Sequence, residues 1–292
     1  MKERRMKIFV VANQKGGVTK STTTAHLSFH AASQGKRVLV VDIDEGSVSS
    51  VFAPVKDDGQ YLRASQLFEE TPPSLTPRPV RENIDLIEND VALHNIDALS
   101  VDILIDIEDE LEKENDKISF DTLRERFGKL IAPLDRNLVA NSLKRFENDY
   151  DICIIDTPPN PSNRLLGALT AADAVIVPID LERVTIERIP LFEKTLMNIA
   201  KDRRMRWQDL LLGYLPSKFD VRSKKQNANL EALRADKKAA VFQQVIGVRS
   251  AIPAALTNGN PVWINARSGA QREAAKEMRA ACEEVFARFN RI

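Results

Sequence analysis

The sequence predicts an α/β protein with a doubly wound, mostly parallel sheet of about seven or eight strands and helices on both faces. Short runs rich in Val and Ile recur along the chain, with stretches of helical periodicity between them. Runs that are apolar at nearly every position indicate strands buried on both faces, as in parallel sheets covered by helices. With 292 residues, 43% of them hydrophobic, the chain is long enough for one large core, and we expect a single domain over 1–292.

The expected strands lie at residues 7–12, 37–44, 84–88, 151–157, 173–180 and 209–216. A helix is expected over 20–34, because the following Gly35 readily adopts the left-handed conformation that ends helices. A second is expected over about 268–290, where apolar residues recur at helical spacing: Ala275, Met278, Cys282, Val285, Phe286 and Phe289. Five prolines make residues 53–83 an irregular connection. Residues 91–148 have a helical pattern, so we expect an acidic helical elaboration of the same domain at about 91–140.

The 42 basic and 42 acidic residues cancel, so any attraction to nucleic acid or to a membrane has to come from local clusters. The N-terminal apolar run is too short for a secretory leader or a membrane-spanning helix. Cys153 lies in an expected strand and Cys282 on the apolar stripe of the last helix. We therefore expect both to be buried packing residues of a reduced, cytosolic protein.

The segment KGGVTKST, residues 15–22, joins the first expected strand to the first expected helix. A loop in this position exposes successive backbone N–H groups at the positive end of a helix dipole, and these groups bind phosphate oxygens. Gly16 and Gly17 allow a close approach, Lys20 reaches the outer phosphates, and the Ser21 hydroxyl is a suitable Mg²⁺ ligand. The segment predicts a site for a nucleoside triphosphate and Mg²⁺.

This segment resembles the deviant phosphate loop K-G-G-x-x-K-[ST] of the family that includes the ParA partition ATPases, MinD and the nitrogenase iron protein. In that family the first lysine crosses a nucleotide-sandwich dimer to the phosphates bound by the other subunit, and Lys15 matches it. The resemblance implies ATP as the nucleotide and these binding residues: Lys15, Gly16, Gly17, Val18, Thr19, Lys20, Ser21 and Thr22. Thr19 stands where the family usually has glycine, so its φ is negative or the loop is strained.

Two acidic segments are expected beside the loop, at the carboxyl ends of neighbouring strands. The first, VVDIDEGS, resembles the family's D-x-D-P-Q-G segment, and strand alternation places Asp42 and Asp44 on one face. By this match Asp44 orients the attacking water or stabilises the active switch, Asp42 supports the metal shell, and Lys15, Lys20 and Asp44 are the expected catalytic residues. Glu45 replaces the usual proline. The second, DTPPN, resembles the family's D-x-P-P motif, which makes Ser21, Asp42 and Asp156 the expected metal residues.

The resemblance to the ParA branch extends through nearly the whole chain. YLPSKFDVR resembles a ParA segment beside the adenine base, so Leu215, Pro216 and Phe219 are expected near the base, with ordinary packing as the alternative. The few residues before Met6 leave no room for the N-terminal helix-turn-helix domain of the larger partition ATPases. We therefore expect a protein of the small ParA type.

Charge is unevenly distributed, with twelve basic and five acidic residues between Lys201 and Arg249, and thirteen acidic and two basic residues between Arg81 and Asp116. Small ParA proteins bind DNA without sequence preference when ATP holds them as dimers. The residues expected to contact phosphates are Lys201, Arg203, Arg204, Arg206, Arg222, Lys224 and Lys225. The acidic stretch is expected to be a solvated helical face, with two alternatives: it docks a basic partner peptide, or it repels DNA from the wrong side of the molecule.

Two other functions remain open from the sequence. A MinD-like membrane-positioning ATPase needs a detachable basic amphipathic C-terminal helix, whereas the last helix here is alanine-rich and nearly balanced in charge. A metabolic ATP-dependent enzyme or iron–sulfur reductase is the other, although Cys153 in mid-strand is unsuited to a bridging cluster. His26 and His30 have metal-ligand spacing but are expected to pack or lie on the surface, and His94 stands alone.

The function expected is a cytoplasmic, nucleoid-associated ATPase of the small ParA type. Two copies enclose two Mg·ATP, the dimer binds DNA, and a ParB-like or other cargo adaptor stimulates hydrolysis and releases it. Plasmid or chromosome partition ranks first among the cargoes, and no membrane binding is expected.

Overall fold

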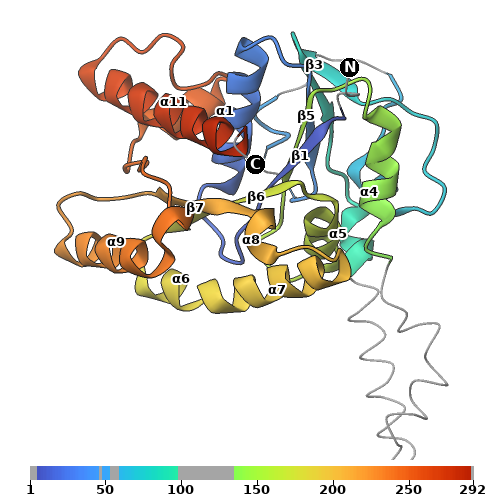
Figure 1. The fold of residues 1–292 in the computed structure, drawn as a ribbon. Coiled ribbons are helices and arrows are strands. Elements are labelled where there is room, and N and C mark those ends of the chain that lie inside the picture. Colours follow the sequence, from blue (N-terminus) through green and yellow to red (C-terminus); the bar gives the residue numbers. More distant parts are fainter. Residues whose placement is uncertain (1–4, 46–47, 53–58, 98–134, 291–292) are drawn as a thin grey trace, which may run out of the picture.

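The computed structural model describes residues 5–45, 48–52, 59–97 and 135–290. A seven-stranded sheet in the order β3-β4-β2-β5-β1-β6-β7 forms its centre (Figure 1). Its strands are β1 (Lys7–Val11), β2 (Val38–Asp42), β3 (Arg78–Arg81), β4 (Ile84–Ile87), β5 (Ile152–Asp156), β6 (Ala174–Asp180) and β7 (Leu211–Ser217). All neighbouring pairs are parallel except β3 and β4. The predicted fold class is confirmed.

Side chains of the central strands alternate between two cores, one on each face of the sheet. In β1, Ile8 and Val10 pack into one core, whereas Phe9 and Val11 pack into the other. A strand covered on both faces has no polar side, which explains why these strands are apolar at nearly every position apart from their ends. The register places the carboxyl ends of β1, β2 and β5 together, since Val11 and Asp42 both align with Asp156.

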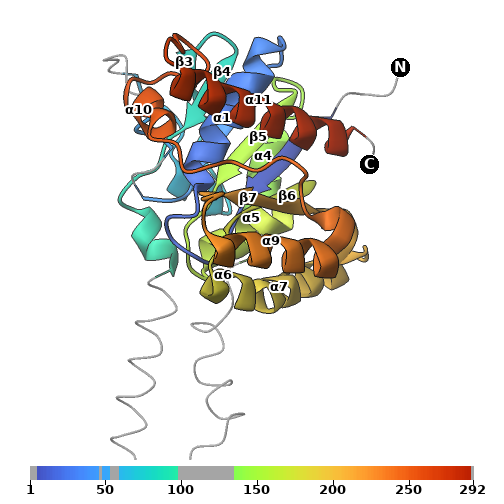
Figure 2. The ribbon, with the colours of Figure 1, turned by 90° about the vertical axis from the view of Figure 1, so that its left-hand side faces the viewer.

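Helices cover both faces, as Figures 1 and 2 show. One core contains side chains of α1 (Lys20–Ser33), α10 (Ala251–Thr257) and α11 (Gly269–Phe289). The other contains side chains of α4 (Leu138–Leu143), α5 (Asn163–Ala171), α7 (Ile189–Asp202) and α9 (Lys224–Lys237). The short helices α6 (Arg183–Glu187) and α8 (Trp207–Leu210) flank α7 along the chain. Three short 3₁₀ turns lie at Ala64–Phe68, Lys144–Phe146 and Lys238–Ala240.

Most expected elements are confirmed. Helix α1 ends beside Gly35, whose φ is 73°, and Ser268 caps α11 by accepting a hydrogen bond from the backbone N–H of Gln271. The apolar stripe of α11 is packed into the core, and Cys153 and Cys282 are buried free thiols. No helix in the described part of the chain is long and apolar enough to cross a bilayer.

The expectation for residues 53–83 was wrong in part. Their end forms the antiparallel edge strand β3, and the 3₁₀ turn Ala64–Phe68 lies within the same segment. Pro79 has no N–H to donate to a sheet. It is tolerated in β3 because the N–H groups on the outer side of an edge strand make no hydrogen bonds to a neighbouring strand. Of the expected acidic elaboration, residues 93–97 form a helical turn, and most of the remainder lies outside the described residues.

Candidate functional site

The loop between β1 and α1 is held to the end of β6 and open on its outer side. The Asn13 side-chain amide donates to the Pro178 carbonyl at 2.7 Å, and its oxygen accepts from the Lys15 N–H at 3.0 Å. Gly16 and Gly17 are exposed, and a Cβ added to either would have no neighbour nearer than 4.0 Å. The loop backbone is therefore accessible to a ligand.

Thr19, the last residue before α1, resolves the two alternatives left by the sequence. Its φ is 73° and its ψ is 23°, in the left-handed region that β-branched residues rarely adopt. This conformation costs an L-residue roughly 1–2 kcal/mol, so the loop is strained. The Thr19 hydroxyl is also buried and has no hydrogen-bond partner among the described residues.

Lys20 begins α1 and is buried near two carboxylates. It is 6% exposed, and this burial lowers the pKa of its ammonium, while the nearby charges of Asp156 and Asp44 act in the opposite direction. The half-buried Ser21 follows it at the N-terminus of α1. A cation, two carboxylates and a hydroxyl thus gather at the end of the sheet where a helix dipole is positive.

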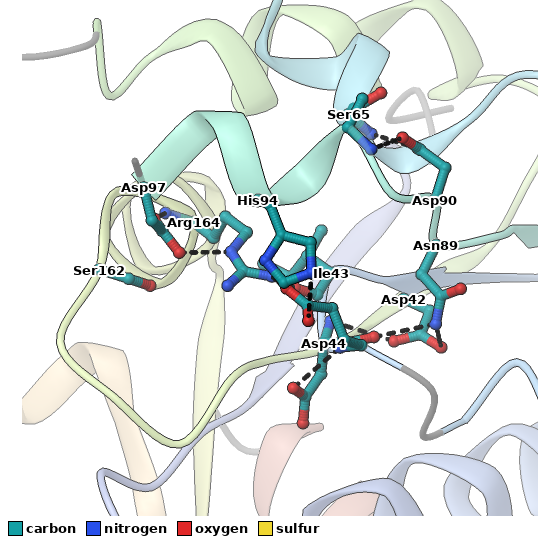
Figure 3. Close-up of polar contacts among 12 residues, drawn as sticks. Asp42, Ile43, Asp44, Ser65, Asn89, Asp90, His94, Asp97, Ser162 and Arg164 are labelled. Carbon is teal, nitrogen blue, oxygen red and sulfur yellow. Dashed lines mark hydrogen bonds and ion pairs between the residues drawn. The ribbon is translucent and has the colours of Figure 1, made fainter. Parts of the chain in front are cut away.

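Asp42 and Asp156 are neighbours in register on β2 and β5, and both are completely buried. Burial, and then the charge of Asp156, raises the pKa of Asp42 to about 7. The Asp42 carboxylate accepts hydrogen bonds from the Asp44 N–H (3.1 Å), the Ser49 N–H (2.8 Å) and the Asn89 side chain (3.0 Å), as Figure 3 shows in part. Asp42 therefore braces the loop that follows β2.

Asp44 lies near Asp42 for a reason different from the one expected. Strand β2 ends at Asp42, so strand alternation does not position Asp44; the hydrogen bond from its own N–H to Asp42 does. Burial raises the pKa of Asp44, while the charges of Lys20 and Arg164 lower it.

Lys15, expected to act across a dimer, makes two contacts within its own chain. Its ammonium lies 2.6 Å from Asp180 Oδ2 at the end of β6 and 2.8 Å from Thr185 Oγ1 of α6. The side chain is 27% exposed. A role in a second subunit stays a prediction.

The three residues expected near the base differ in their exposure. Leu215 is 1% exposed and packs into the core beneath α1 and α11, as the packing alternative proposed. Pro216 is buried in β7 and its carbonyl accepts from the Ile246 N–H, whereas Phe219 is half-buried just beyond the strand. Contact with a base stays a prediction for these residues.

Two cations near the phosphate loop were not predicted. The Lys218 ammonium lies 4.0 Å from the position that a Cβ on Gly17 would occupy. Arg188 Nη1 lies 3.4 Å from the carbonyl oxygen of Gln14. Lys218 belongs to the segment YLPSKFDVR, which resembles the ParA segment beside the adenine base. Its place in this segment is the one sequence feature that could have indicated a position near the nucleotide.

The expected DNA-contacting residues form two groups rather than one stripe. Lys201, Arg203, Arg204 and Arg206 precede β7, and Arg222, Lys224 and Lys225 follow it. A strand rises about 3.3 Å per residue, so the seven residues of β7 separate the groups by about 20 Å. Four of the seven are already engaged: Arg203 with the Ala172 carbonyl, Arg206 with Asp209, Arg222 with Asp220 and Lys225 with Glu182.

The histidines act as packing and surface groups. His26 is completely buried; its Nδ1 lies 2.7 Å from the Thr22 carbonyl, and its Nε2 accepts from the Val262 N–H. His30 stacks on Phe286. No group of three or more His, Cys, Asp or Glu within the described ranges is arranged to hold a metal. His94 Nε2 lies 2.9 Å from the Glu45 carboxylate.

Comparison with known proteins decides the family. A profile described as an AAA domain matches residues 6–208. Protein IncC of Escherichia coli is 34% identical over 97% of this chain and 70% of its own length. The chain belongs to the ParA/MinD family of ATPases. The chromosome-partitioning ATPase Soj of Thermus thermophilus is 27% identical over 97% of both chains. An ATP complex of McdA from Cyanothece has the same fold, with a TM-score of 0.73, 18% identity, and coverage of 98% of this chain and 97% of that one.

Membership of the ParA/MinD family gives the geometry its context. The open loop with Gly16 and Gly17, the buried Lys20 and the strand-end carboxylates occupy the place where open α/β sheets bind ligands, beyond the carboxyl ends of the strands. Helix α11, which the MinD-like alternative requires to detach, is bound into the core through Met278, Cys282 and Val285.

Proposed function

We propose that this chain binds Mg·ATP at the loop of residues 15–22 and hydrolyses it slowly as a partition or positioning ATPase. The buried Lys20 at the start of α1, with Asp156 beside the same helix at 3.3 Å from Thr24 Oγ1, carries this proposal. An ammonium near two carboxylates, beside an open loop of backbone N–H groups, suits a triphosphate whose charge Mg²⁺ partly neutralises.

The available oxygen donors fit Mg²⁺. This ion takes few protein ligands and keeps waters and phosphate oxygens, so the lack of an all-protein cage among the described residues agrees with it. Ser21 would supply a hydroxyl and Asp156 a carboxylate, in direct contact or through water. Asp42 supports this shell through the loop it braces. When bound, Mg²⁺ would neutralise charge on the phosphates.

The protein groups would act by position and charge. Lys20 would bind the outer phosphates, and Asp44 would hold the attacking water, because a side-chain acceptor that orients water is a recurring part of phosphoryl-transfer sites. The loop amides would bind the phosphate oxygens that gain charge in the transition state.

The proposal extends to a homodimer in which Lys15 reaches the nucleotide of the partner subunit. Its support is the family's defining lysine at this position and a side chain that is partly exposed at the loop. A cation supplied by the second subunit would tie dimerisation to the nucleotide state, as an arginine finger does elsewhere.

The dimer would bind DNA non-specifically and locate to the nucleoid in the cytoplasm, and a ParB-like or other adaptor would stimulate hydrolysis and release it. The chromosome-partitioning ATPase Soj of Thermus thermophilus and a chromosome-partitioning ParA of Myxococcus xanthus support a partition role. The basic groups before and after β7 support the DNA contact, and because each is small, both together would be needed for useful affinity.

Nucleotide binding by Lys20→Ala tests the proposal. We expect Mg·ATP affinity, measured by titration calorimetry, to fall at least about 100-fold, because a buried charged hydrogen-bond partner of the phosphates is lost. Lys7→Ala is the matched control, since Lys7 is an exposed lysine at the opposite end of β1. Equal affinity in Lys20→Ala and wild type would refute the site.

A further inference from the structure

Arg164 is a buried cation beside the proposed nucleotide site, and the expected site residues did not include it. It lies in the first turn of α5, and its side chain is only 7% exposed. A guanidinium stays charged at any ordinary pH, and its burial is costly unless it is paired and hydrogen-bonded. Arg164 is paired: its Nε lies 2.5 Å from Asp97, and its Nη1 lies 3.1 Å from Glu45 and 3.2 Å from the Ile43 carbonyl.

These contacts join three separate parts of the chain, as Figure 3 shows for Arg164, Asp97 and Ile43. Ile43 and Glu45 belong to the loop after β2. Asp97 is the last described residue of the helical segment 93–97, which is bound to α5 a second time by the Asn163 side chain at the Ile96 carbonyl. Helix α5 itself follows β5, the strand that ends in Asp156. One side chain therefore joins the loop after β2, α5 and the turn 93–97.

The residue between the two anchored positions is Asp44. Among the described contacts its carboxylate accepts one hydrogen bond, from the Glu45 N–H at 3.0 Å, and its own N–H is bound by Asp42. The placement of this carboxylate thus depends on the backbone on either side. Arg164 holds that backbone from both sides, through the Ile43 carbonyl and the Glu45 side chain.

We propose that Arg164 is a positioning residue for ATP hydrolysis, which anchors Ile43 and Glu45 so that Asp44 faces the phosphate loop. The proposal rests on the nucleotide site proposed above. A guanidinium suits this task because its planar fork fixes the direction of several donors at once, whereas a lysine ammonium is a point charge on a flexible stem. Asp97 completes the arrangement by balancing the charge and fixing Nε.

A purely structural role predicts a different pattern of kinetics. Loss of a buried pairing that serves only the fold lowers stability and leaves the turnover of the folded fraction unchanged. Loss of a group that positions Asp44 lowers kcat and has little effect on KM, because the phosphate loop and Lys20 still bind the nucleotide.

The test compares Arg164→Met, Arg164→Lys and the double variant Arg164→Met with Asp97→Asn. We measure kcat and KM for Mg·ATP and the thermal midpoint of each. A misplacement of about 1 Å costs up to about 100-fold in rate, so we expect kcat of Arg164→Met to fall about 10- to 100-fold, with KM within about twofold. Arg164→Lys restores part of kcat. The double variant regains thermal stability, because neither buried charge is left unpaired, but kcat stays low.

Arg37→Met is the matched control, because Arg37 pairs with Asp151 and is 51% exposed, at the opposite end of β2. We expect wild-type kcat for it. Wild-type kcat in folded Arg164→Met, or recovery of kcat together with stability in the double variant, would overturn the positioning role. The Lys20→Ala binding experiment tests the nucleotide site separately. If that site is wrong, Lys20→Ala binds ATP as tightly as wild type, independently of the result for the Arg164 variants.

Discussion

Protonation of His26 should lower the free energy of unfolding of this protein at mildly acidic pH. The ring is completely buried in α1, where Nε2 accepts a hydrogen bond from the Val262 N–H at 3.2 Å and Nδ1 donates to the Thr22 carbonyl at 2.7 Å. A protonated ring has two donors and no acceptor, so it would face the Val262 N–H with another N–H. Burial lowers the pKa of His26 from 6.5 to about 4.

The size of the effect follows from this shift. The unfolded chain binds a proton at His26 near pH 6.5 and the folded chain only near pH 4, so the unfolded state binds more protons between these values and stability falls as pH falls. Each pKa unit is worth 1.36 kcal/mol, which gives a limit of about 3 kcal/mol below pH 4. Between about pH 7.5 and about pH 5 the loss is about 2 kcal/mol.

Equilibrium urea unfolding of wild type and of His26→Gln at about pH 7.5 and about pH 5 measures this loss of unfolding free energy. Asp42, with its pKa raised to about 7, changes stability in the opposite direction, but it does so in both proteins and cancels in the comparison. We expect wild type to lose about 2 kcal/mol more than His26→Gln on acidification. His30→Gln replaces a half-buried histidine of the same helix, whose pKa burial also lowers, and is the comparison variant, for which we expect a smaller effect than for His26→Gln. A difference below about 0.5 kcal/mol would refute the reasoning, as would an NMR titration of His26 near pH 6.5.

Three further outcomes are expected. Thr19→Gly should raise the free energy of unfolding, measured by urea unfolding, by about 0.5–1 kcal/mol. The reason is that relief of the strain of a left-handed conformation exceeds the entropy cost of a glycine. An equal gain in Thr19→Ala would contradict this. Lys15→Ala should keep nucleotide binding but lose ATP-dependent dimers in light scattering and most hydrolysis, and wild-type behaviour in both assays would end the trans role. Lys224→Glu should lower the slope of log affinity for DNA against log salt by about 1 or more in gel shifts, whereas an unchanged slope would remove Lys224 from the contact.

The parts of the fold that the sequence predicted well are those with a continuous local signal. Strands β1, β2, β5 and β6 are buried on both faces, so their runs of Val and Ile stand out without any knowledge of the partners. The strand β3 gave no such signal, since it has four residues, lies at the edge and contains Pro79. Its pairing with β4 is a tertiary effect that overrides a weak local preference.

The site was predictable where one segment holds the chemistry and not where distant segments meet. Residues 15–22 contain the loop, Lys20 and Ser21 together, so motif reading located them. Arg164 meets Glu45 and Asp97 across 119 and 67 residues, and Lys15 meets Asp180 across 165, and no spacing rule connects such positions. The basic residues expected to contact DNA lie on either side of β7 in the chain, and their contact with DNA stays a prediction.

The contact between Lys15 and Asp180 bears on how a lysine of this kind could distinguish nucleotide states. Within one chain the ammonium has a carboxylate at 2.6 Å and a hydroxyl at 2.8 Å, so a trans contact has to exchange these partners for phosphate oxygens. The exchange is favourable only if the phosphates present more negative charge than one carboxylate does, and the pair is partly exposed, which keeps the cost of breaking it small. A triphosphate satisfies this condition better than an empty site. If Lys15 acts in trans as proposed, Asp180 would set a threshold: two protomers without nucleotide would gain nothing from bringing their lysines together, whereas two loaded protomers would.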